Sequence, residues 1–288
     1  MMGKGKDKVS VALCCRNGAK FLAEQLESIV TQTATPFEVV VCDDRSTDNT
    51  WDIARAFARS HAEIRWRIHR NESCLGVRAN FEQAIRLATG DYIATCDQDD
   101  IWEPDKIEVL LAFARRNGAG LVYSDVTFID EKGTPLATSA RALYGLDKKM
   151  ALRNYLFDNN NAIGCTYMFD AALKKYLFPF PRHYYYHDQW IAIMAYNHGG
   201  IFFCDKKLVR YRQHASNLVA SLNGGGMKER LSRAYFQNKS KDFALVLRKR
   251  KEIGYSLFTL FPLLRIYMTG VTGLAYLKYR VFFRETTE

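Results

Sequence analysis

The chain has 288 residues, 48% of them hydrophobic and 25% charged, which is the composition of a globular protein with a sizeable core. Its seven cysteines include no CxxC pair, and those in apolar strand-like runs behave as small hydrophobes, so we expect a reducing compartment and no zinc site. The net charge of +10 favours an anionic partner: a nucleotide, a phospholipid surface or nucleic acid.

Strands and helices alternate through the first part of the chain. The expected strands are Val9–Cys15, Phe37–Cys42, Ile64–His69 and Tyr92–Cys96. The expected helices cover Ala19–Thr31, about Ser46–Arg59, the stretch between Gly76 and Gly90, and the stretch between Pro104 and Gly118. This order predicts an α/β fold with a mostly parallel sheet flanked by helices, of the Rossmann-like kind.

Polar residues follow three of these strands. In such sheets ligands bind outside the carboxyl ends of the strands, so we expect Arg16–Asn17, Asp43–Asp44 and Asp97–Asp100 to lie along one edge. Three carboxylates after a buried strand repel one another unless a cation neutralises them, and a hard divalent ion with oxygen ligands would do so. The alternative is a helix start with solvated aspartates.

The second part of the chain mixes short helices and strands. The expected elements are a strand at Leu121–Ile129, a hairpin turn at Asp130–Gly133, a short helix at Lys148–Phe157, a polar loop from Asn159 to Asn161, a strand at Gly164–Phe169, a helix at Trp190–Tyr196, and strands at Ile201–Cys204 and Leu208–Tyr211. This half is of the α+β type and is expected to shape a second binding site beside the first.

The composition shifts beyond Gly224–Gly226. Lys228–Lys251 is strongly basic, and Ile253–Phe283 is apolar and aromatic but interrupted by Pro262, Arg265 and Lys278. Each uninterrupted piece is too short to span a bilayer comfortably. We expect amphipathic helices attached to an anionic inner leaflet. The alternatives are packing onto the domain or onto a second subunit in a homo-oligomer.

Four motifs stand in a fixed order. They are VALCCRNG (Val11–Gly18), VVVCDDRSTDNT (Val39–Thr50), GDYIATCDQDDIWEP (Gly90–Pro104) and HDQW…YRQH (His187–His214). Together they resemble family-two glycosyltransferases, which have the GT-A fold, over roughly Val9–Asn217. The last two motifs are most similar to the bacterial rhamnosyltransferase branch, and this resemblance implies an inverting sugar transfer in O-antigen-like surface polysaccharide synthesis.

The resemblance implies a nucleotide and metal site in the first half. Asp44 matches the aspartate that hydrogen-bonds a pyrimidine base. Asp97 and Asp99 match the DxD pair: Asp99 would hold Mg²⁺ or Mn²⁺ at the donor diphosphate, and Asp97 would contact the ribose or the metal. Arg16, beside Asn17, stands where many relatives have an aromatic residue, and it would touch the diphosphate or lie on the surface. Arg78 is a further candidate for nucleotide contact.

The resemblance places the acceptor chemistry in the second half. Asp188 matches the catalytic base, which takes the proton from the acceptor hydroxyl; the alternative is a helix N-cap, and it could serve as both. Trp190 would pack against a sugar ring or lie in the core. His187 would orient the base or be exposed. His214 would touch the metal or the diphosphate, and Arg212 could pair with phosphate.

The expected function is therefore a metal-dependent transferase that moves L-rhamnose from dTDP-rhamnose, or another sugar from a UDP donor, to a saccharide or lipid-linked acceptor. A sugar nucleotidyltransferase would need a Gly-rich basic loop after the first strand, which is absent. A nucleic-acid binder would interleave basic residues with stacking aromatics, and this chain does not, so no nucleic-acid partner is expected. A catalytically silent membrane scaffold would not need the aspartates.

We expect a GT-A domain over residues 1–220, with a nucleotide-sugar half at about 1–125 and an acceptor half at 126–220, followed by a basic, amphipathic helical tail at 221–288. The start of the chain, MMGKGKDK, has no apolar signal-peptide core. The expected location is cytoplasmic, peripheral at the inner face of the cell membrane.

Overall fold

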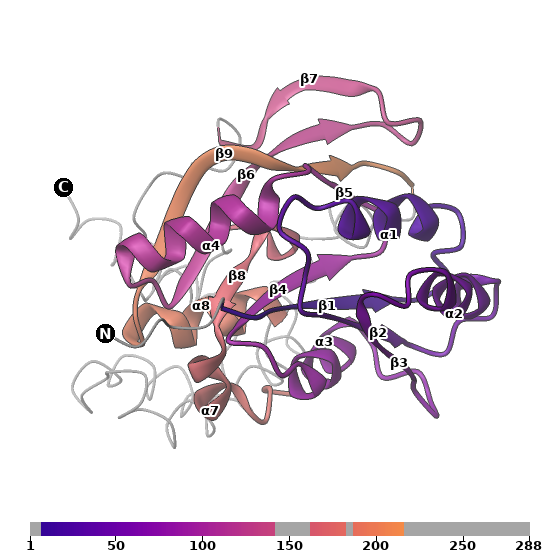
Figure 1. Ribbon diagram of the computed structural model, residues 1–288, viewed down its shortest axis with the longest axis horizontal. Helices are drawn as coiled ribbons and strands as arrows, with labels where there is room; N and C mark the ends of the chain where they lie inside the picture. Colours follow the sequence, from indigo (N-terminus) through magenta and orange to yellow (C-terminus); the bar gives the residue numbers. More distant parts are fainter. Residues whose placement is uncertain (1–6, 142–161, 183–186, 216–288) are drawn as a thin grey trace, which may run out of the picture. The chain divides into compact units, whose positions relative to one another are not determined.

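The computed structural model describes residues 7–141, 162–182 and 187–215 (Figure 1). The chain divides into two compact units, residues 1–180 with 186–213, and residues 181–185 with 214–288. The first unit carries the sheet described below. The expected helix at Lys148–Phe157, the loop at Asn159–Asn161 and the tail at 221–288 lie outside the described residues. No helix in the described ranges is long and apolar enough to cross a membrane.

The first part of the chain builds the parallel half of the sheet. Its strands are β1 (Val9–Cys15), β2 (Glu38–Asp43), β3 (Arg65–Arg70) and β4 (Tyr92–Asp97). Its helices are α1 (Leu22–Val30), α2 (Thr50–Ser60), α3 (Val77–Leu87) and α4 (Lys106–Asn117). Every residue of β1 and β2 is buried, which explains their near-continuous apolar runs. These elements were all predicted, with boundaries a few residues different.

The second part of the chain completes a mixed sheet. Its strands are β5 (Ile101–Trp102), β6 (Leu121–Ile129), β7 (Pro135–Ser139), β8 (Met168–Asp170) and β9 (Ile201–Arg212). Its helices are α7 (Lys174–Leu177) and α8 (His187–Asn197), with 3₁₀ turns η1 (Gly164–Thr166) and η2 (Ala171–Leu173). The strand order is β3-β2-β1-β4-β8-β6-β9-β5, with β7 paired to β6.

The sheet is mixed because β8 runs antiparallel to both β4 and β6. The strands from β3 to β4 are parallel, as predicted, and β6 and β9 are parallel again. Helices cover both faces, with α1 and α4 on one side and α3 and α7 on the other (Figure 1). The expectation of a mostly parallel sheet therefore holds only for the first half.

In the second half, two of the predicted strand assignments differ from the structure and the predicted hairpin turn is confirmed. The stretch predicted as one strand at Gly164–Phe169 is the turn η1 followed by the short strand β8. The two strands predicted at Ile201–Cys204 and Leu208–Tyr211 form the single long strand β9, whose pairing with β6 shifts register near Asp125. The predicted hairpin turn is confirmed, because Gly133 N donates to Asp130 O at 3.0 Å between β6 and β7.

Candidate active site

The polar segments that follow β1, β2 and β4 lie along one edge of the sheet. These three strands are parallel neighbours, with Cys15 opposite Asp43 and Cys14 opposite Asp97. Their carboxyl ends therefore meet at the same edge, which is where ligands bind in open α/β sheets. The structure confirms this part of the prediction.

A buried acidic cluster lies where β4 ends. Asp100 is 1% exposed, and its Oδ1 accepts a hydrogen bond from Arg212 N at 3.0 Å. Its Oδ2 is buried and has no well-formed hydrogen bond among the described residues, although the weakly donating thiol of Cys165 lies beside the carboxylate. Burial and the neighbouring Asp99 raise the pKa of Asp100 to about 7. Burial also raises the pKa of Asp97 well above its usual range, with contributions from the charges of Asp99, Asp100 and Asp188.

Burial and the charges of neighbouring carboxylates raise these pKa values, and the charge of Lys106 does not fully offset them. A divalent ion would reverse the effect, because it favours the ionised form and accepts carboxylate oxygens as ligands. Asp97 and Asp99 are therefore chemically suited to hold Mg²⁺ or Mn²⁺. A cation would also stabilise the buried Oδ2 atom of Asp100, which lacks a strong hydrogen-bond donor among the described residues.

Lys106, in the first turn of α4, is a buried cation beside this cluster. Its side chain is fully buried, and Nζ donates to the carbonyl oxygen of Cys165 at 2.7 Å and lies 3.6 Å from the centre of the Trp102 ring. Burial lowers its pKa to about 8. The sequence reasoning missed this residue. The helical spacing could have indicated its burial, because Lys106 lies four residues before Leu110 and therefore on the same, buried face of the helix.

Gln98, the middle residue of the DxD motif, joins the metal-binding loop to the end of β1. Its Nε2 donates to Arg16 O at 3.1 Å, and its Oε1 accepts from Arg16 N at 2.7 Å. A Cβ at Gly18 would lie 2.2 Å from Gln98 Oε1, so only glycine leaves room for this amide. The sequence reasoning did not single out Gln98 or Gly18.

The two residues after β1 have different surroundings. The side chain of Arg16 is exposed and has no ion pair within the described parts of the chain. Asn17 has a left-handed backbone (φ +50°), and its side-chain oxygen accepts from Thr47 N at 2.8 Å. Asn17 thus ties β1 to the loop after β2. Nucleotide contact by Arg16 and Asn17 stays a prediction.

Asp44 is enclosed by the loop that precedes α3. It is 2% exposed; Oδ1 accepts from Leu75 N at 2.7 Å and Asn71 Nδ2 at 2.9 Å, and Oδ2 accepts from Gly76 N at 2.8 Å. Burial alone would raise the pKa of Asp44, but these hydrogen bonds hold it below its usual value. Asp44 therefore fixes the 71–76 loop in this structure. Recognition of a base by Asp44 stays a prediction and requires an exchange of these donors.

Arg78 lies at the edge of the same loop, in the first turn of α3. The helix begins immediately after Gly76, whose φ is +82°. Arg78 is half-buried and forms no ion pair with any residue that the structure describes. Its guanidinium is therefore available to an anion, and contact with a nucleotide remains a prediction.

Asp188 lies in the first turn of α8, near the acidic cluster. Its Oδ1 accepts from Gln189 N at 2.7 Å, and its charge contributes to the raised pKa of Asp97. A Cβ at Gly164 would lie 2.9 Å from Asp188 Cβ and 2.9 Å from His187 Nε2. The predicted base thus approaches the predicted metal site across a turn that requires glycine. Because α8 begins at His187, Asp188 is inside the helix and is not its N-cap.

His187 is buried next to Asp188. It is 5% exposed and stacks on Phe81 with 3.6 Å between ring centres. Neither ring nitrogen has a hydrogen-bond partner in the described structure. Burial lowers its pKa to about 3, so the ring is neutral at physiological pH. The alternative that His187 is simply exposed was wrong, because α3 packs against α8 here.

Trp190 and Arg212 are both 1% exposed. Trp190 Nε1 donates to Leu177 O at 2.8 Å, which places the ring in the core and supports the alternative of a core tryptophan over stacking on a sugar.

Arg212 donates to Asp99 O at 2.9 Å, to Glu131 O at 2.9 Å and to Glu24 Oε2 at 2.5 Å. It thus holds the backbone of the acidic loop, and pairing with phosphate stays a prediction.

His214 begins the part of the second compact unit that follows β9. Contact of His214 with a metal or the diphosphate stays a prediction.

The sequence matches the family model Glycosyl transferase family 2 over residues 10–177, more than half of the chain. The chain belongs to this family. The mixed sheet with its flanking helices is the GT-A-like fold that the family resemblance implied.

Three known proteins illustrate the relationship. Chondroitin synthase of Escherichia coli is 34% identical over 126 residues, which are 43% of this chain and 18% of that protein. The dTDP-rhamnosyl transferase RfbG of Shigella flexneri is 29% identical over 251 residues, 82% of this chain and 80% of RfbG. The structure of the mannosyltransferase PcManGT from Pyrobaculum calidifontis, in complex with GDP-Man and Mn²⁺, has a TM-score of 0.61 at 19% identity, covering 96% of this chain and 76% of that one. The likeness to PcManGT shows the fold.

Proposed function

We propose that the protein is an inverting, metal-dependent glycosyltransferase of bacterial surface polysaccharide synthesis. It transfers a sugar from a nucleotide donor to a saccharide or lipid-linked acceptor. The observation that carries this proposal is the approach of Asp188 to the Asp97–Asp100 cluster across Gly164. A base on one side and a metal-suited pair of carboxylates on the other are the two groups that an inverting, metal-dependent sugar transfer would use.

The roles of the residues follow from their positions. Asp97 and Asp99 would hold Mg²⁺ or Mn²⁺, which supplies positive charge for the departing nucleoside diphosphate. Gln98 and Arg212 hold the backbone of this loop through Arg16 and Asp99. Asp188 takes the proton of the acceptor hydroxyl as its oxygen attacks the anomeric carbon from the face opposite the leaving group. Arg16 and Arg78 offer guanidinium groups to the diphosphate.

L-rhamnose from dTDP-rhamnose is our first choice of donor. Supporting it are the DQDDIW and HDQW motifs and the length of the alignment with RfbG. The alternative is a UDP-sugar, because the ring N–H that an aspartate such as Asp44 would recognise is common to thymine and uracil. Thymine or uracil must first displace the backbone N–H groups of the loop that now donate hydrogen bonds to Asp44.

The donor is tested by thermal-shift measurements with dTDP, UDP, GDP, CDP and their sugars, each with Mg²⁺ or Mn²⁺. A ligand that binds only the folded protein raises the apparent melting temperature. A metal-dependent shift with dTDP and a further change with dTDP-rhamnose would support our first choice. A preference for UDP would change the donor and keep the mechanism. No shift with any nucleotide would contradict the proposal.

The base is tested by Asp188→Asn. This substitution removes the proton acceptor and leaves the metal ligands, so we expect transfer to fall by about 100- to 10,000-fold with unchanged donor binding. Asp205→Asn, at an exposed position of β9, is the matched control and should keep full activity. Normal turnover by Asp188→Asn would show that Asp188 is not the base.

We also propose peripheral attachment to an anionic membrane through the basic, apolar sequence after residue 221. Flotation with vesicles that contain anionic lipid is the test, with vesicles of neutral lipid as the control. Binding should fall as salt rises, because the basic segment contributes through screened charges. Equal recovery with both vesicle types would contradict this part of the proposal.

A further inference from the structure

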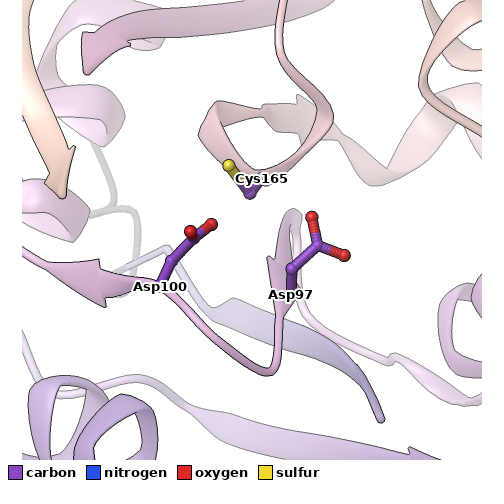
Figure 2. Close-up of side chains that lie close together, drawn as sticks. All are labelled: Asp97, Asp100 and Cys165. Carbon is purple, nitrogen blue, oxygen red and sulfur yellow. The ribbon is translucent and has the colours of Figure 1, made fainter. Parts of the chain in front are cut away.

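Beside two carboxylates of the acidic cluster, Asp97 and Asp100, lies a thiol that could also bind a metal ion, that of Cys165. Figure 2 shows Asp97, Asp100 and Cys165 converging from the end of β4 and from η1. One ligand atom from each of the three lies within 4.8 Å of the others. Cys165 is fully buried and Asp97 is partly exposed, so the cluster has an inner thiol and an outer carboxylate.

Asp100 supplies independent evidence that a ligand belongs in this cluster. Its Oδ2 is buried, and the thiol of Cys165, a weak donor, approaches the carboxylate without a well-formed hydrogen bond to this oxygen, so a cation would lower the free-energy cost of its burial. The nearby ammonium group of Lys106 does not fill this role, because it donates its hydrogen bond to the carbonyl oxygen of Cys165.

We infer that Asp97, Asp100 and Cys165 form a second divalent-metal site, selective for an ion that accepts thiolate, such as Zn²⁺. The ligand set differs from the Asp97–Asp99 pair of the proposed transferase. Carboxylate oxygens alone suit Mg²⁺ and Mn²⁺, whereas a thiolate selects softer ions. Cys165 would lose its proton on binding, so metal uptake releases a proton.

Charge and geometry both fit such an ion. Two carboxylates and one thiolate carry three negative charges, which Lys106 and a divalent ion together neutralise. Zn²⁺ bonds of about 2.0–2.3 Å place tetrahedral ligands roughly 3.3–3.8 Å apart. The three side chains, whose ligand atoms now lie within 4.8 Å of one another, would have to close by about 1.5 Å at most, a change that rotation of Asp97 at the partly exposed side can supply.

A shared ligand makes the two sites exclusive. Asp97 belongs to both sets, so an ion held by Cys165 would withdraw Asp97 from the catalytic pair. This consequence rests on the proposed function: Zn²⁺ should inhibit transfer in competition with Mg²⁺ or Mn²⁺. The existence of the thiolate site does not rest on it and can be tested without any sugar substrate.

The test is a titration of the purified full chain with Cd²⁺ or Co²⁺, followed by the sulfur-to-metal charge-transfer absorption. We expect one equivalent to bind with this absorption. Cys165→Ser should abolish it, and Asp100→Asn should weaken binding by at least about 100-fold, because loss of a ligand costs no less than the roughly 10- to 100-fold that loss of a supporting group costs. Asp205→Asn, at an exposed position of β9, is the carboxylate control, and Cys74→Ser removes an exposed thiol; both should keep the absorption.

No absorption in the unsubstituted protein, or absorption that persists in Cys165→Ser, would overturn the inference. If Cys165→Ser does not fold, the comparison of Asp100→Asn with Asp205→Asn decides, because equal affinities in the two variants would also overturn it. A negative result leaves the transferase proposal intact. Failure of nucleotide binding in the thermal-shift panel would in turn leave this site intact.

Discussion

At the scale of single residues, the site is held by groups that do no chemistry themselves. Gln98 pairs with the backbone of Arg16, Lys106 with that of Cys165, and Arg212 with that of Asp99. Each of these polar side chains comes from a different part of the chain and ends on a main-chain carbonyl. The positions of the aspartates therefore depend on hydrogen bonds that a motif search does not read.

Gly18 and Gln98 should be energetically coupled. An Ala at position 18 would displace the Gln98 amide and so remove its two hydrogen bonds to Arg16. We expect Gly18→Ala to lower the free energy of unfolding by about 1–3 kcal/mol. In a Gln98→Ala background the same substitution should cost close to nothing. Urea unfolding of the four proteins measures the coupling, and additive effects would refute it.

The residue types at the site could be predicted only where they fall into a motif. The aspartates after β2 and β4, and the Asp188 position, were found from strand ends and from the family resemblance. Lys106, Gln98 and Cys165 were not, because their roles arise from contacts between residues 59 to 82 positions apart. Trp190 shows the opposite case: its place in a functional motif did not reveal that its ring lies in the core.

At the scale of elements, sequence reasoning worked where local signals and tertiary packing agree. The strands β1, β2 and β4 and the helices between them have strong apolar patterns and clear ends. The strand β9 was split in two because its polar middle, Asp205–Lys207, is exposed and interrupts the apolar pattern. The two-residue strand β5 was missed because only its pairing with β9 defines it.

The end of α4 offers a prediction about backbone conformation alone. Gly118 caps this helix with a left-handed backbone (φ +56°), and a Cβ there would meet no atom within 4 Å. Gly118→Ala should therefore destabilise the protein by about 1 kcal/mol through strain and not through a clash. Gly118→Asn should cost less, since Asn tolerates this conformation. Chemical unfolding of both variants is the measurement, and equal losses would contradict it.

At the scale of the whole molecule, the buried His187 predicts how stability responds to acid. The folded pKa of about 3 lies below the usual 6.5, so between these values only the unfolded chain binds the proton. The free energy of unfolding should therefore fall as pH drops below 6.5. His187→Phe keeps the stacked ring on Phe81 and removes this titration.

The measurement is urea unfolding of both proteins between pH 6.5 and pH 5. We expect the difference between them to change by about 1–2 kcal/mol in favour of His187→Phe over this interval. Parallel curves for the two proteins would show that His187 does not titrate in this way. If His187 orients Asp188, the variant should lose transfer while keeping its stability at neutral pH.

The position of Arg212 has a consequence for how the protein is made. This residue is at the end of β9, and it supplies the donors that hold Asp99, Asp100 and the turn at Glu131. Chains emerge from the ribosome N-terminus first. The acidic loop is thus synthesised more than a hundred residues before its anchor, and the site can reach its final geometry only after residue 212 has emerged and β9 has joined the sheet.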